Sequence, residues 1–174
     1  MDFFAEIIST DETLKAVEAA VKELKQHDVL VGIPQEKSSR QGSKGKATNA
    51  ELLFIHTNGS PIRGIPARPV LQPAIKNDKE RIGEMLGKAV DKAVSGKIEE
   101  IAPALERAGI YGAKVCKDWF VNPSNGWKPN SPRTLKHKKS TRPLIDTSEM
   151  RKSITYVVRN NSGTDIVGGM KEKK

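Results

Sequence analysis

Cysteine is nearly absent from this chain of 174 residues, which contains only Cys116, and histidine occurs three times. A single cysteine excludes an internal disulfide framework and favours a reducing compartment. His27, His56 and His137 lie far apart in the sequence and form no cluster with the cysteine. We therefore predict no structural zinc site and interpret each histidine as a surface or boundary side chain.

Aromatic residues and long apolar runs are also scarce. Aromatics make up 5% of the chain and hydrophobic residues 36%, whereas charged residues reach 29%. The core is therefore predicted to be thin and mostly aliphatic. No run approaches the roughly 20 apolar residues of a membrane-spanning helix, and the start MDFFAE does not resemble a signal peptide. We expect one soluble domain over residues 1–174, with apolar faces that neighbouring molecules help to bury.

Acidic residues are outnumbered by basic ones, 21 against 30, which gives a net charge of +9 and an attraction to polyanions. Positive charge concentrates in the predicted basic loop, residues 122–143, where the run PRTLKHKKSTR contains no acid. The run is either a solvated loop or a segment that contacts nucleic-acid phosphates without base specificity. The DNA-facing candidates are Arg133, Lys136, Lys138, Lys139 and Arg142.

Apolar spacing predicts the elements of the N-terminal third. A capping box in the sequence STDE precedes a helix predicted over residues 10–26, and DVLVGIP predicts a strand. The polar residues 35–47 carry no apolar anchor and predict a mobile loop. A short helix capped by Asn49 is expected to end at Asn58-Gly59.

Proline dominates the next segment, SPIRGIPARPVLQP, and imposes extended or turn geometry on it. Beyond this arm, a long helix from Pro73 to Gly96 and a second helix that begins at Pro103 are expected to pack on each other. SITYVVR and TDIVGG predict a C-terminal hairpin. The expected fold class is α+β: a small antiparallel sheet with a C-terminal hairpin packed against two long helices, with extended loops and a proline-rich arm.

The triplet Asp146-Thr147-Ser148 resembles the active-site turn of an aspartic protease, in which two such turns bring together carboxylates that share a proton. This chain has one such turn, which follows basic residues and precedes good helix formers. The favoured alternative is that Asp146 caps a short helix and Glu149 completes a capping box. A dimeric protease remains the competing enzyme class.

Other candidates for chemistry also have a structural interpretation. Cys116 lies on the apolar face of a predicted helix, where a small buried hydrophobe is favoured over a nucleophile. Trp119 belongs to the same apolar stripe, whereas Trp127 is the better candidate for an interface. GSKGK lacks the spacing of a phosphate-binding loop. We therefore expect no enzyme, and no catalytic residue, cofactor or metal.

Five segments carry a resemblance to a known family: VGIP, ELLFIHTNGSP, IPARPVLQPAI, PNSPRTLKHKKS and PLIDTSEMRKSITYVV. In this order, over roughly residues 29–168, they resemble the tail-completion and virion-morphogenesis proteins of long-tailed bacteriophages. The main departure is Ser148, which stands where those proteins usually have glycine. Since glycine readily takes left-handed angles, the serine affects only the local turn.

The resemblance implies a non-enzymatic virion protein that forms a homo-oligomeric ring at the neck or the top of the tail, completes the tail and joins it to the head. Its expected location is the virion, and the host cytoplasm during assembly. The implied partners are copies of itself and other neck and tail proteins, with the DNA in the lumen as an additional candidate. The alternative function is a sequence-nonspecific DNA- or RNA-binding domain.

Under this interpretation the proline-rich segment is a preorganised arm that docks on an adjacent subunit, because proline reduces the entropy lost on binding. An intramolecular brace across the sheet is the alternative role of the arm. The candidate interface residues are Ile65, Pro66, Arg68, Pro69, Val70 and Trp127.

Overall fold

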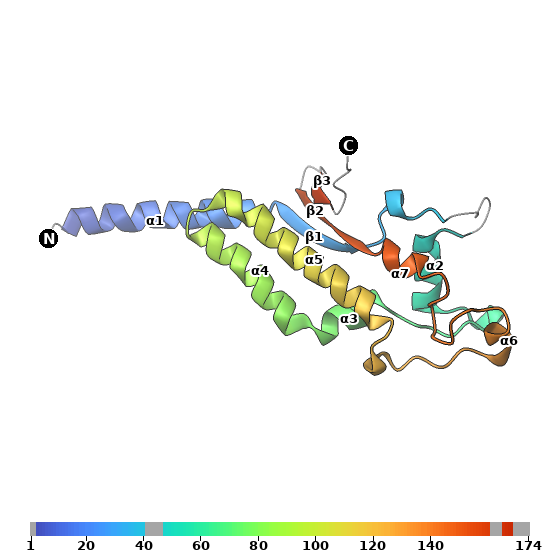
Figure 1. The fold of residues 1–174 in the computed structure, drawn as a ribbon. Helices are drawn as coiled ribbons and strands as arrows, with labels where there is room; N and C mark the ends of the chain where they lie inside the picture. Colours follow the sequence, from blue (N-terminus) through green and yellow to red (C-terminus); the bar gives the residue numbers. More distant parts are fainter. Residues whose placement is uncertain (1–2, 41–46, 161–164, 169–174) are drawn as a thin grey trace. The chain divides into compact units, whose positions relative to one another are not determined.

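The structure is a computed structural model that describes residues 3–40, 47–160 and 165–168, with side chains described for residues 12–40 and 47–160 (Figure 1). The fold is α+β, as expected. Contacts divide the chain into two compact units: unit 1 is formed by residues 1–30, 80–109 and 157–174, and unit 2 by residues 31–79 and 110–156. Neither unit is one continuous stretch, and helix α5 (Ile101–Trp119) contributes residues to both.

Unit 1 contains the first helix, α1 (Phe3–Leu24), which begins earlier than predicted. Residues 3–8 contain no proline or glycine and continue the helix toward the N-terminus. Ser9 therefore lies inside the helix and the predicted N-terminal capping box is wrong. At the other end, Nδ1 of His27 lies 2.9 Å from the Glu23 carbonyl oxygen.

The predicted long helix after the arm is two helices, α3 (Leu71–Asn77) and α4 (Lys79–Val94). The break is at Asp78, whose ψ of 22° is not helical and whose carboxylate accepts a hydrogen bond from the Tyr111 hydroxyl at 3.0 Å. The hydrogen bond ties the Asp78 side chain to α5, and aspartate is in any case a weak helix former. Gly96, at φ 72°, follows the end of α4 as predicted.

Helix α5 begins before Pro103, which therefore lies in its first turn rather than at its first position. A short 3₁₀ helix, Ile98–Glu100, leads directly into it. Proline is tolerated in the first turn because the N–H groups there have no partner within the helix. Lys92 of α4 and Glu100 form an ion pair at 2.5 Å that closes the connection between the two helices.

In the part of the chain that the structure describes, the sheet has three strands in the order β1 (His27–Gly32), β2 (Thr155–Asn160) and β3 (Asp165–Gly168). Strands β2 and β3 are antiparallel, so the two strands of the predicted C-terminal hairpin are confirmed. The turn predicted between them falls on residues 161–164, outside the described residues. A register shift after Val158 marks an irregularity in the pairing.

Unit 2 has its own apolar core, in which side chains from the arm, α3, α5 and α7 (Glu149–Ser153) meet. Cys116 and Trp119 are buried there, as predicted. The cluster is aliphatic apart from two rings, in agreement with the scarcity of aromatics. Its buried members are Leu53, Val70, Ala74, Val115, Cys116, Trp119, Phe120, Met150 and Ile154.

Helix α2 (Asn49–Asn58) packs on α7, and its N-terminus differs from the prediction by one residue. Thr48 is the cap: its backbone N–H donates to Glu51 Oε2 at 2.8 Å, and its hydroxyl accepts from the Glu51 N–H at 3.2 Å. Asn49 is instead buried, and its side-chain amide donates to the Ser153 hydroxyl of α7 at 2.9 Å. A capping box thus begins the helix, while the neighbouring asparagine fixes it to α7.

The first part of the predicted mobile loop is ordered. Residues Gln35–Lys37 form a 3₁₀ helix, and Ser38 is buried. The Ser38 carbonyl accepts from the Asn49 N–H at 2.8 Å, and its hydroxyl accepts from the Ala50 N–H at 3.2 Å. Ser38 thus satisfies backbone donors at the start of α2, which have no partner within the helix. Polar contacts of Ser38 therefore anchor this part of the loop, which has no apolar residue to do so. Residues 41–46 lie outside the described residues.

We predict that Gly59→Ala lowers the free energy of unfolding by about 2–4 kcal/mol. An added Cβ would lie 2.7 Å from the Ala67 backbone nitrogen and 2.9 Å from the Ile65 carbonyl oxygen, at a φ of 72°. Gly64→Ala is the matched control, because Gly64 also has a positive φ but nothing within 4 Å of its added Cβ. The control should lose only about 1–2 kcal/mol in urea unfolding followed by circular dichroism. Equal losses would contradict a close approach at Gly59.

Candidate functional site

Unit 2 contains a cleft of about 1120 Å³. One wall runs from the end of α2 through the proline-rich arm, residues 56–68. The other wall is the segment of residues 128–138, which includes the short helix α6 (Pro132–Leu135), together with Leu144 and Asp146. The cleft therefore lies between the two segments that the sequence singled out, the arm and the basic loop.

The arm is folded into a hook at the end of α2. Ser60 and Ile65 exchange two backbone hydrogen bonds, of 2.8 and 2.9 Å, and a 3₁₀ helix, Pro61–Arg63, lies between them. Gly59 takes a positive φ where α2 ends, and the Arg68 N–H donates to the His56 carbonyl at 2.5 Å. These contacts place the arm directly against the helix that precedes it.

Arg68 and Val70 have intramolecular roles, which corrects their assignment to a subunit interface. The Arg68 side chain is 7% exposed, and its Nη2 donates to the carbonyl oxygens of Lys128 at 2.9 Å and Pro129 at 3.2 Å. Val70 is fully buried in the core of unit 2. The arm is therefore a brace, although it spans from α2 to residues 128–129 rather than across the sheet. Ile65, Pro66 and Pro69 are half-buried, and their interface role stays a prediction.

Trp127 also packs within its own molecule. Its ring meets Phe120 edge to face, with centroids 5.9 Å apart and planes at 88°. The side chain is half-buried against the core cluster of unit 2. A ring fixed in this way anchors the start of the basic segment, so Trp127 is a weaker interface candidate than its position between Gly126 and Lys128 suggested.

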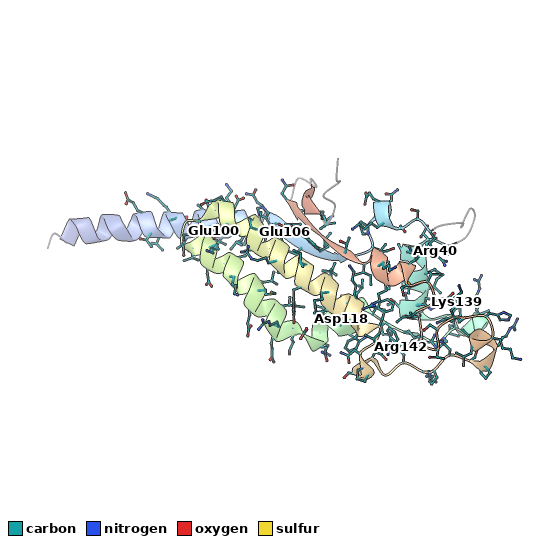
Figure 2. All side chains as sticks on the ribbon, viewed as in Figure 1. Arg40, Glu100, Glu106, Asp118, Lys139 and Arg142 are labelled. Atoms are coloured by element: carbon teal, nitrogen blue, oxygen red, sulfur yellow. The ribbon has the colours of Figure 1, made fainter. Side chains whose placement is uncertain are left out.

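The basic segment is an ordered loop closed by its own polar contacts. The Asn130 amide donates to the Thr141 carbonyl at 2.9 Å, and Lys138 Nζ donates to the Arg142 carbonyl at 2.7 Å. In Figure 2 the side chains of Lys139 and Arg142 lie on this segment. The loop thus has a defined shape, unlike a merely solvated charge run.

Asp146 belongs to this loop and does not cap a helix. Its Oδ1 accepts from the Lys139 N–H at 3.2 Å. Helix α7 is preceded by Ser148, which has a φ of 64° and forms no side-chain capping bond. The Asp146–Glu149 capping box is therefore wrong, because Ser148 adopts the left-handed conformation that glycine takes more readily.

The cleft brings together some of the predicted basic residues. Arg133 and Lys138 line it, whereas Lys136, Lys139 and Arg142 are exposed on the same segment without lining it. Three further cations line the cleft, and the sequence did not predict this for any of them: Arg63, Arg68 and Lys128. The sequence PIRGIPARP alternates arginine with proline and glycine, and this pattern could have indicated that the arm is a positively charged turn.

Charge in the cleft is strongly unbalanced. Among the described residues, five cationic side chains and one carboxylate line it, an excess of four positive charges with His56 neutral. Burial, and then the charges of Arg68 and Lys138, lower the pKa of His56. Burial also lowers the pKa of Lys138; Asp146 opposes this shift and Arg68 adds to it. The cations thus repel one another in a partly desolvated site, which favours an anion as ligand.

Other chemistry has little support in the described residues. Within them, no group of three or more His, Cys, Asp or Glu side chains is placed to hold a metal ion. Their helices also include none that is both long and apolar enough to span a bilayer. Burial raises the pKa of the Cys116 thiol to about 11, which suppresses the nucleophilic thiolate.

Comparisons with protein-family models, curated proteins and solved structures find no match for the chain. Function must therefore be inferred from the cleft, from the exposed apolar side chains, and from the resemblance of the five sequence segments.

We predict that Arg68→Met lowers the free energy of unfolding by about 1–3 kcal/mol, because the Lys128 and Pro129 carbonyls lose their donor and the brace opens. Arg63→Met is the matched control: it removes the same charge from the same cleft at an exposed position. The control should stay within about 0.5 kcal/mol of the parent protein in urea unfolding. A stability loss of the same size in both variants would contradict the brace.

We predict that Cys116 does not react with a disulfide thiol reagent at pH 8 until the protein unfolds in guanidinium, when one equivalent reacts. A thiol pKa that is higher in the folded state than its ordinary value of 9.0 stabilises the folded state below pH 9.0. This contribution is lost as the pH rises through about 11, and Cys116→Ala should remove that part of the pH dependence. Rapid labelling of the native protein would contradict the burial.

Proposed function

We propose that this protein is a structural, non-enzymatic virion protein of a long-tailed bacteriophage, and that copies of it form a ring at the neck or the top of the tail. The ring completes the tail and joins it to the head. The five ordered segments described above support the family. An uncovered apolar stripe on α4 supports the assembly of identical subunits, and it is the observation that carries the proposal.

The stripe consists of Leu86, Val90 and Val94, spaced at i, i+4 and i+8 on one face of α4. The three side chains are 38%, 47% and 53% exposed, whereas Ala89 and Ala93 are the buried residues of the helix. Ile82 and Met85 of the same helix are half-buried, whereas these three larger apolar side chains stay exposed, which is unusual for an amphipathic helix. The helix therefore offers its larger apolar side chains to a partner.

Further apolar side chains are exposed in unit 1. Ile98 follows α4 and is 47% exposed, and Leu14 and Val21 of α1 are also exposed. Single exposed apolar residues need no explanation, but a row along a helix is typical of an interaction surface. If each copy contacts a different surface on the next, and the rotation between copies closes, the product is a ring.

The cleft in unit 2 favours the second candidate function, a sequence-nonspecific DNA- or RNA-binding domain. Its excess of four positive charges would attract a polyanion without the help of other copies. The two candidates predict different species in solution. A ring protein assembles as its concentration rises, whereas a free-standing nucleic-acid-binding domain binds as a monomer, with an affinity that falls steeply with salt.

We predict that the double substitution Val90→Asp with Val94→Asp weakens self-association at least about tenfold, because two carboxylates replace apolar side chains at the contact. Lys88→Glu is the matched control: it makes the same change in net charge, at an exposed position of α4 outside the stripe. Sedimentation velocity over a concentration series gives the association constants, and negative-stain electron microscopy shows whether the oligomers are rings.

Circular dichroism should show the same helix content in both variants, since all the substituted positions are exposed. A parent protein that stays a single copy at every concentration would contradict the proposed function. Equal weakening by the Lys88 control would show that net charge, rather than the apolar stripe, governs assembly.

A further inference from the structure

Arg68 is a buried cation without an acidic partner. Its side chain is 7% exposed, and in the described part of the chain it forms no ion pair with a carboxylate. Two backbone carbonyls accept from Nη2, while Nε is buried and makes no hydrogen bond to any described residue. Carbonyl dipoles offset only part of the cost of taking a charge out of water, so an anion near this guanidinium would be stabilised.

The four cations that line the cleft with Arg68 are not neutralised either. Arg63, Lys128 and Arg133 are exposed and Lys138 is half-buried, and the structure shows no ion pair between any of them and a described carboxylate. Of the described residues that line the cleft, Asp146 is the one that is acidic, and its Oδ1 accepts a backbone N–H. The charge excess is therefore available to a ligand.

The volume and lining of the cleft indicate the kind of anion. A cleft of about 1120 Å³ has room for more than one phosphate or carboxylate group, which suits a ligand with several charges on a connected chain. Phe, Tyr and Trp are absent from the described residues that line the cleft, which argues against base stacking. Recognition would then depend on the charged backbone of the ligand.

The exposed cations outside the cleft favour nucleic acid over an acidic peptide. Lys136, Lys139 and Arg142 continue the positive surface along the same loop, which holds its shape through its own hydrogen bonds. Charge that extends past the cleft matches a polymer with one phosphate per residue along its whole length.

We propose that the cleft between the arm and the basic loop binds the phosphodiester backbone of nucleic acid without reading its bases, with the exposed Arg63 and Arg133 contacting phosphates and the buried Arg68 adding positive charge behind them. This inference rests on the proposed function only in naming the DNA inside the ring as the natural ligand. The binding chemistry itself depends on unit 2 alone.

The test is fluorescence anisotropy of the full-length protein with labelled 20-nucleotide single strands of mixed sequence, over a series of salt concentrations. Arg63→Ala with Arg133→Ala should lower the affinity roughly tenfold and reduce the slope of log K against log salt by about 1.4. Both side chains are exposed, so the fold should be kept. Single strands of different sequence should bind with the same affinity.

Lys76→Ala with Lys88→Ala is the matched control, since both lysines are exposed and lie outside the cleft. It removes the same charge and should change the affinity less than about twofold. Equal losses in the two double variants would show diffuse attraction to a basic protein and would overturn the proposed site. Preferential binding of a glutamate-rich peptide, with displacement of DNA, would overturn the choice of ligand.

His56 gives a readout inside the cleft. Arg68 and Lys138 lower its pKa by repulsion, beyond the effect of burial, and Arg63, Lys128, Arg133 and Asp146 line the same cleft. A bound phosphate chain screens this repulsion, so the pKa of His56, followed by NMR, should rise when the oligonucleotide is added. His56→Gln identifies the signal. An unchanged pKa at saturating oligonucleotide would place the ligand elsewhere and contradict the proposal.

The same samples test the cleft site and the ring independently. The double variant Val90→Asp with Val94→Asp should self-associate more weakly in sedimentation and still bind the oligonucleotide through unit 2. Oligonucleotide binding without any assembly of the parent protein would support the cleft site and contradict the ring. Assembly without oligonucleotide binding would support the ring and contradict the cleft site.

Discussion

The contact on which the site depends is the buried Arg68 guanidinium bound to the carbonyl oxygens of Lys128 and Pro129. It joins two segments that are about 60 residues apart in the sequence. On one side, Val70 continues the arm into the core. On the other, the backbone leads into α6 and the basic loop. This arginine therefore links the two walls of the cleft directly.

A lysine could not take this role equally well. The planar guanidinium presents several donors in a fixed fork and loses less hydration than an ammonium when it is buried. Two carbonyls use Nη2 alone, so the same side chain can fasten the arm and still contribute charge to the cleft. Structure and electrostatics are thus linked: the residue that shapes the cleft also makes it attractive to anions, and it lowers the pKa of His56.

The sequence predicts the elements better than their ends, and local competition between polar groups explains why. Helix periodicity located α2 and α5, but Thr48 rather than Asn49 caps α2, because the asparagine side chain reaches Ser153 about 100 residues away. The long helix predicted from Pro73 is interrupted at Asp78, whose carboxylate accepts a hydrogen bond from Tyr111, also distant in sequence. Such contacts form only after folding, so no local pattern contains them.

The candidate site was predicted in part for the same reason. The run PRTLKHKKSTR revealed its charge, and so Arg133 and Lys138 were found in advance. That Arg63, Arg68 and Lys128 line the same cleft follows from the hook of the arm, which turns on Gly59 and Gly64 at positive φ. Arg68 and Trp127 were assigned to a subunit interface, but Arg68 is buried against the Lys128 and Pro129 carbonyls and Trp127 is half-buried against the core cluster of unit 2.

The two proposed activities use different surfaces of the chain. Assembly relies on the apolar stripe of α4 in unit 1, whereas anion binding relies on the cleft in unit 2. A thin core with exposed aliphatic side chains suits a protein that is completed by its neighbours. An ordered basic loop suits a protein whose neighbours surround a polyanion. A ring around DNA would use both properties at once.

The central claim is that the buried arginine organises a cleft with uncompensated positive charge. The most direct measurement is a crystal structure of the protein soaked in selenate, a tetrahedral anion whose position is identified by anomalous scattering. The account predicts a strong peak within the cleft, close to the cationic groups of Arg68 and Lys138. An empty cleft beside well-occupied selenate elsewhere, or a carboxylate of the protein itself bound to Arg68, would contradict it.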